Sequence, residues 1–158
     1  MRCADAAWQN GNLNENQAHF FEGESIPYRL RLSSLPVGTS HVVRIEWDTT
    51  QYQSSKVNHA LDYVTSYDRT ETDAEPCSGI AGCTSWTTSH WPIPIDANVT
   101  AGPDGSIGTA DDNITQVPGD FWLFGGTITG VSAYTVSGSY DGTSQTAISI
   151  SFTSLVAQ

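Results

Sequence analysis

The segment AGPDGSIGTADDN, residues 101–113, combines carboxylates and glycines in a pattern that suits a bound cation. Calcium takes roughly six to eight oxygen ligands from carboxylates, Asn side chains and backbone carbonyls, so a short chain must curl around the ion to supply them. Glycines permit that curl, and Asp96 and Asn98 stand just upstream with the alternate spacing of the first ligands of a calcium loop. We therefore predict a calcium site with the ligands Asp96, Asn98, Asp104, Asp111 and Asp112. The alternative is a solvated polar loop in which Asp and Gly only form turns.

Cys77 and Cys83 form a second pair with a definite chemistry, because they flank the short loop SGIAG. A loop of this length can bring two Cα atoms within disulfide reach. There is no CxxC motif and no His at zinc-finger spacing, so a structural zinc site is not expected. We predict a Cys77–Cys83 disulfide, which indicates an oxidising compartment. Cys3 is left over, either free, bonded to another chain or paired outside this segment.

The remaining reactive residues follow no catalytic pattern. None of the four histidines lies in an HExxH or HxH motif, and no GxSxG elbow surrounds a serine. Acidic residues are numerous enough for a glycosidase pair, but nothing in the sequence singles out two of them. His59 and Asp62 lie three residues apart, and we interpret them as a packed or surface pair. We expect the protein not to be an enzyme.

Aromatic residues offer a different kind of site. Five tryptophans are many for a chain of 158 residues. Trp47 and Trp122 lie in expected strands and are predicted to be core. The candidates for stacking on a sugar or a partner protein are Trp8, Trp86 and Trp91. For Trp86 and Trp91, covering a long loop is an equally good interpretation.

The charge balance excludes several partners. The chain carries 17 acidic against 6 basic residues, a net charge of −11. Nucleic acids and anionic membranes require clustered Lys and Arg, so neither is an expected partner. No apolar run reaches the roughly 18 residues of a membrane span, and membrane insertion is not expected. The N-terminal residues lack the apolar core of a signal peptide, so any secretion signal has been removed or lies outside this sequence.

The elements that must position these residues are predicted to be strands. Alternation of period two runs through PYRLRLSSL, where Tyr28, Leu30 and Leu32 share a face, and through HVVRIEWDTT and TAISISFTSL. The stretch SLPVGTS predicts a hairpin or a corner between the first two, and SYDGTS predicts a hairpin near the C-terminus. KVNHALDYVTSY is also interpreted as a strand.

These strands predict an all-β fold, an antiparallel β-sandwich of immunoglobulin-like or jelly-roll topology. Residues 69–110 are poor in alternation and rich in Pro, Gly, Asp and Thr, so we expect one long loop region there. Residues 18–158 are expected to form a single sandwich domain. Residues 1–17 are polar and rich in Asn, and we interpret them as a leader or an exchanged segment.

Two parts of the chain resemble known proteins. GPDGSIGTADDN resembles the GPDGxxGTADD segments of large secreted and cell-surface bacterial proteins, where the motif is taken as a cation-binding loop. WQNGNLNENQAHFFEGESIPYRLRL, followed by HVVRIEWDTT and HALDYVTSYDRT, is similar to an uncharacterised module of predicted secreted prokaryotic proteins. The resemblance implies an extracellular β module, supplies no catalytic residues, and assigns the cation role to Asp96, Asp104, Asp111 and Asp112.

Together these observations predict a non-enzymatic structural or adhesive module with a calcium-stabilised loop, in a cell-surface protein or an extracellular filament. The expected partners are further copies of the chain, forming an oligomer or filament, or adjacent domains of a larger surface protein. The alternative is a carbohydrate-binding module with glycans as partners.

Overall fold

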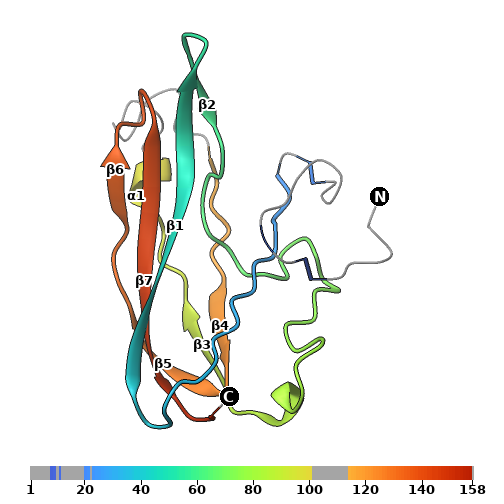
Figure 1. The fold of residues 1–158 in the computed structure, drawn as a ribbon. Helices are drawn as coiled ribbons and strands as arrows, with labels where there is room; N and C mark the ends of the chain where they lie inside the picture. Colours follow the sequence, from blue (N-terminus) through green and yellow to red (C-terminus); the bar gives the residue numbers. More distant parts are fainter. Residues whose placement is uncertain (1–7, 10, 12–19, 22, 101–113, 158) are drawn as a thin grey trace.

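The computed structural model describes residues 8–9, 11, 20–21, 23–100 and 114–157. Strands dominate this part of the chain, as Figure 1 shows, and the predicted all-β, antiparallel, sandwich-like fold is confirmed. The strands are β1 (Ser40–Gln53), β2 (Lys56–His59), β3 (Thr88–Pro92), β4 (Asp120–Phe124), β5 (Gly126–Val131), β6 (Thr135–Gly138) and β7 (Ser144–Ser154). The helices described are a 3-10 turn (Cys83–Ser85) and α1 (Ala97–Thr100).

The larger sheet is built around β7. Its strands lie in the order β2-β1-β7-β5, and β6 also pairs with β7. β1 and β7 run antiparallel along most of their lengths, from Ser40 opposite Thr153 to Asp48 opposite Gln145. The smaller sheet contains β3 and β4, and β3 contacts β5 of the larger sheet. β1 and β7 confirm the strands predicted from the alternation in HVVRIEWDTT and TAISISFTSL.

The core lies along one face of β7. Ile148 and Phe152 are almost fully buried there, because side chains two residues apart point to the same face of a strand. The face is not evenly covered, since Ile45, directly opposite Ile148 on β1, remains 37% exposed. The sheet is therefore well packed at β7 and thinly covered at β1.

The predicted C-terminal hairpin is present between β6 and β7. Gly138 lies opposite Ser144, and the Asp-Gly turn connects them. Gly138 adopts a φ of +83°, and a Cβ there would lie 2.1 Å from the carbonyl oxygen of Thr143. A glycine is therefore required at this position.

One predicted strand is absent. Residues 26–35 include the alternating stretch PYRLRL but belong to no sheet, and Tyr28 and Leu30, expected to face the core, are 68% and 66% exposed. The turn before β1 explains the difference, because Gly38 donates its N–H to the carbonyl of Ser154 (2.8 Å). The turn that leads into β1 is therefore bonded to the last residue of β7, and residues 26–35 form no hairpin with β1.

Two further expectations need correction. The strand predicted over 56–67 ends at His59. Ala60 and Leu61 still donate backbone N–H groups to β1, and further on Thr65 Oγ1 donates to the carbonyl of Val117 (2.8 Å). The region 69–110 is not a continuous loop, because β3 lies within it and pairs with β4. Sequence alternation missed β3 because Pro92 and polar residues interrupt the pattern.

Candidate functional site

Asp96 is the predicted metal ligand that the structure describes best. Its side chain is completely buried (0% exposed) at the start of α1. Oδ1 accepts hydrogen bonds from the backbone N–H and the side-chain amide of Asn98, both at 3.0 Å, and so caps the helix. Oδ2 is buried and has no hydrogen-bond partner among the residues that the structure describes. A buried carboxylate oxygen without a partner is costly, and a cation would remove that cost.

Gln116 organises the backbone around Asp96. Its amide nitrogen donates to the carbonyl of Asp96 (2.7 Å) and to Thr100 Oγ1 (2.8 Å), while its amide oxygen accepts the N–H of Asp96 (2.9 Å). These bonds join the chain on either side of the acidic segment. Sequence reasoning missed Gln116, because a lone Gln after a polar loop carries no signal of its own.

The other predicted ligands are less informative. Asp104, Asp111 and Asp112 lie outside the described residues. Asn98 is exposed, and it turns its amide nitrogen toward Asp96. Across the described ranges, no group of three or more His, Cys, Asp or Glu side chains is placed to hold a metal. Asp96 thus offers one buried carboxylate oxygen, and the metal role of all five residues stays a prediction.

Two tyrosines lie within the electrostatic reach of Asp96. Tyr134 donates its hydroxyl to the carbonyl of Pro94 (2.9 Å). Burial raises the pKa of the Tyr134 phenol, and the negative charge of Asp96 raises this pKa further. Burial likewise raises the pKa of Tyr140, with Asp96 as a smaller contributor. The carboxylate therefore stands in an aromatic, poorly hydrated environment.

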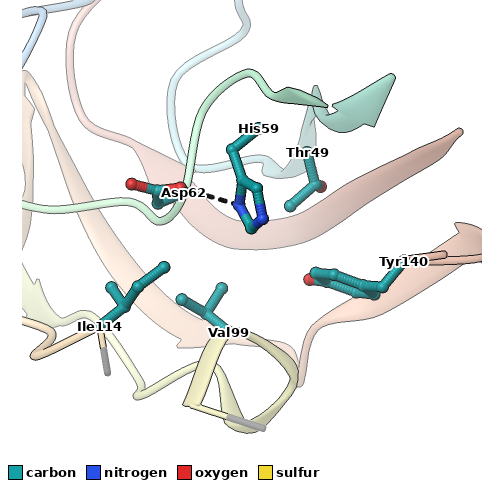
Figure 2. Close-up of a pocket in the computed structure, with 6 residues that line it drawn as sticks. All are labelled: Thr49, His59, Asp62, Val99, Ile114 and Tyr140. Carbon is teal, nitrogen blue, oxygen red and sulfur yellow. Dashed lines mark ion pairs between the residues drawn. The ribbon is translucent and has the colours of Figure 1, made fainter. Parts of the chain in front are cut away.

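Tyr140 also borders a small hollow, shown in Figure 2. His59 Nδ1 and Asp62 Oδ1 are 3.4 Å apart at its rim, as expected for a surface pair, and Val99 lines the opposite wall. The cavity holds about 10 Å³, enough for one water molecule. The hydroxyl of Thr49, which also lines the hollow, is paired with Thr146 at 2.6 Å. The hollow suits a bound water better than a substrate.

Trp8 borders a larger hollow of about 350 Å³. Its ring lies 4.5 Å below the guanidinium of Arg29, and its indole N–H donates to the carbonyl of Glu75 (2.8 Å). Arg31 and Ile80 line the same hollow. Burial lowers the pKa of Arg29, and the charge of Arg31 lowers it further. The site thus combines an aromatic ring with two cationic groups in a strongly acidic protein.

Trp86, Trp91 and Trp122 do not line the hollow beside Trp8. Trp86 is half-buried against Gly125, where a Cβ would approach its ring to 3.3 Å. Trp91 lies in β3 and not in a loop. Trp122, expected to be core, is 43% exposed and stacks on His90 with ring centroids 5.1 Å apart.

The predicted cysteine pair is seen. Cys77 and Cys83 are buried at disulfide-bonding distance, with Cα atoms 5.3 Å apart. Such a pair is compatible with an extracellular protein.

No helix among the residues described is long and apolar enough to cross a membrane. No protein-family model matches the chain, and neither a curated protein nor a solved structure matches it.

Proposed function

We propose that this protein is a non-enzymatic structural or adhesive module of an extracellular surface protein or filament, stabilised by calcium bound at its acidic loop. The proposal follows from the composition of residues 101–113, from their resemblance to GPDGxxGTADD segments, and from the state of Asp96 beside them. The Cys77–Cys83 pair supports an oxidising, extracellular location.

The observation that carries the calcium assignment is the buried Oδ2 of Asp96, to which no described residue donates a hydrogen bond. Hard cations bind carboxylate oxygens, and the adjacent segment supplies three more carboxylates within a short distance along the chain. Gln116 bonds to both Asp96 and Thr100, so described residues that precede and follow this segment lie close together.

Thermal unfolding in calcium and in chelator tests this proposal. A ligand that binds only the folded state stabilises it by about 2.7 kcal/mol at roughly a hundredfold excess over its Kd. For a protein of this size, we expect calcium to raise the melting temperature by several degrees and EDTA to reverse the rise.

The decisive variant is Asp96→Asn, because Asn also caps helices and preserves the volume. It should keep the melting temperature seen in EDTA but lose the response to calcium. Asp141→Asn, an exposed residue in the β6–β7 turn, is the matched control and should respond like the wild type. A wild-type protein that melts at the same temperature in calcium and in EDTA would rule out the calcium assignment.

A carbohydrate-binding module is the second candidate, favoured by the hollow beside Trp8. Its volume falls in the range of small-ligand sites, and an aromatic ring can stack on a sugar while Arg29 and Arg31 attract a carboxylate. The ligand that fits this chemistry is an acidic, uronate-containing sugar.

Calorimetric titration with an oligogalacturonate tests this alternative, with a neutral cello-oligosaccharide as the control ligand. Binding of the acidic sugar alone, lost in Trp8→Ala and Arg31→Ala but kept in Trp122→Ala, would favour the carbohydrate-binding function. Heat changes that are equal for both sugars, or absent for both, would exclude it.

A further inference from the structure

Residues 26–35 leave their backbone unpaired. None of their N–H or C=O groups makes a hydrogen bond to another described residue. Tyr28 and Leu30 point into solvent, 68% and 66% exposed. The segment carries the alternating pattern of a strand, so it has the backbone groups and the side chains for a sheet, but no sheet to join.

The larger sheet has a matching open edge. Over Ser40–Trp47, β1 pairs with β7 on one side only. β2 pairs with β1 from Thr50 onward, and residues 60–61 bond the carbonyls of residues 48–49. No described residue pairs with the other side of Ser40–Trp47. We call this stretch the β1 edge. Open edges are templates for an added strand.

The two features do not join within one chain. Gly38 donates to the carbonyl of Ser154 (2.8 Å), Ser154 donates back to the carbonyl of Thr39 (3.1 Å), and the Ser154 hydroxyl contacts the carbonyl of Pro36. These bonds draw the connecting turn toward β7, on the side opposite the β1 edge. Residues 26–35 would have to break them to fold back onto their own β1.

Charge on the two segments is complementary. Arg29 and Arg31 lie two residues apart. Arg29 donates to the carbonyls of Pro76 (2.9 Å) and Ser78 (2.6 Å), whereas Arg31 is exposed. Glu46 and Asp48 lie two residues apart on the exposed face of β1, where Glu46 is paired with Arg44 and Asp48 accepts a hydrogen bond from Gln145 (2.9 Å). Because a strand repeats every two residues, one pairing register brings both arginines beside both acids. The same register places Leu30 on the thinly covered face that carries Ile45.

We propose that residues 26–35 of one copy of this protein add as a strand to the β1 edge of a second copy. Each copy then offers one donor segment and one acceptor edge. The contact is heterologous, so it propagates into a chain of subunits unless the rotation closes a ring. The proposal deepens the structural role proposed above by naming the partner, and it does not depend on calcium.

Sedimentation velocity over a range of protein concentrations tests the assembly. The wild type should associate as its concentration rises. Leu30→Pro removes an N–H that has no partner among the described residues, and it should lower the association constant at least about tenfold, as should Tyr28→Ser. Tyr52→Ser, at an exposed tyrosine where β1 already pairs with β2, is the control and should associate normally.

A charge exchange shows whether the contact joins two copies. R31E and E46R should each associate at least about tenfold more weakly than the wild type, because like charges then face each other. Mixing the two variants should restore association, because every contact between unlike copies pairs opposite charges.

A wild-type protein that stays monomeric at millimolar concentration would overturn the proposal. So would association that withstands Leu30→Pro, or a mixture of R31E and E46R no more associated than either alone. Each variant is also melted in calcium and in EDTA. A cooperative melting transition shows that the variant is folded, whether or not calcium shifts it, so failure of this interface is distinguished from failure of the calcium assignment.

Discussion

At the scale of single residues, the unusual feature is a set of polar groups buried close to one another. Thr49 pairs with Thr146 and Thr50 pairs with Ser144, each at 2.6 Å between hydroxyl oxygens. Tyr140 connects this hydroxyl set to Asp96, whose charge acts on its phenol. Buried polar groups are tolerated when they are paired. Two buried side-chain atoms have no hydrogen-bond partner among the described residues, Asp96 Oδ2 and Trp47 Nε1.

Tyr134 makes this environment measurable through pH. Its pKa in the folded protein lies above the ordinary value of 10.0, first because of burial and then because of Asp96. Above about pH 10 the unfolded chain loses the phenolic proton before the folded protein does, so the free energy of unfolding falls as the pH rises. Below this pH the contribution is complete.

Tyr134→Phe should therefore flatten the alkaline loss of stability, measured by urea unfolding between pH 8 and about pH 11. The variant also loses the hydrogen bond to Pro94, which costs about 1 kcal/mol at neutral pH. Tyr52→Phe, at an exposed position, is the control. An alkaline slope that is the same with and without the Tyr134 hydroxyl would contradict this account.

At the scale of elements, the sequence predicts the strands that bury one face. The alternation in β1 and β7, and the Asp-Gly turn between β6 and β7, identify these elements correctly. The strand prediction is wrong for residues 26–35. Alternation indicates a preference for the strand conformation, but it does not indicate whether a sheet edge is close enough to pair with. It fails for β3, because cross-strand pairing with β4 stabilises a stretch that has little pattern of its own.

Only part of the candidate site could likewise be predicted from the sequence. Asp96 was predicted from its spacing to Asn98, but its burial and its unpaired Oδ2 depend on packing that no local pattern records. Gln116 and Tyr134 reach Asp96 from segments further along the chain, so only the fold reveals them. The Cys77–Cys83 pair was accessible from sequence because a short loop alone brings the two residues together.

The uneven cover of the larger sheet gives a prediction for two isoleucines that face each other. Ile148 on β7 is 1% exposed, and Ile45 opposite it on β1 is 37% exposed. Ile148→Ala should lower the free energy of unfolding by about 2–5 kcal/mol, and Ile45→Ala by clearly less. Urea unfolding of the two variants at one pH compares them directly. Equal losses would show that β1 is as well covered as β7.

At the scale of the whole molecule, charge and surface both suit an extracellular structural role. A net charge of −11 favours solubility and attracts cations, while self-repulsion opposes the compact state. A bound cation would offset part of that repulsion beside Asp96. The β1 edge and the unpaired residues 26–35 would allow the same module to join its neighbours. Calcium would thus stabilise the subunit, and strand addition would assemble it.

Terbium luminescence tests the calcium claim most directly, because terbium(III) occupies calcium sites and nearby aromatic rings sensitise its emission. Tyr134 and Tyr140 both feel the charge of Asp96, so an ion bound there lies near two sensitisers. The account predicts saturable emission from a single ion per chain, displaced by calcium, lost in Asp96→Asn and retained in Asp141→Asn. Emission that never saturates, or that is as strong in Asp96→Asn as in the wild type, would contradict it.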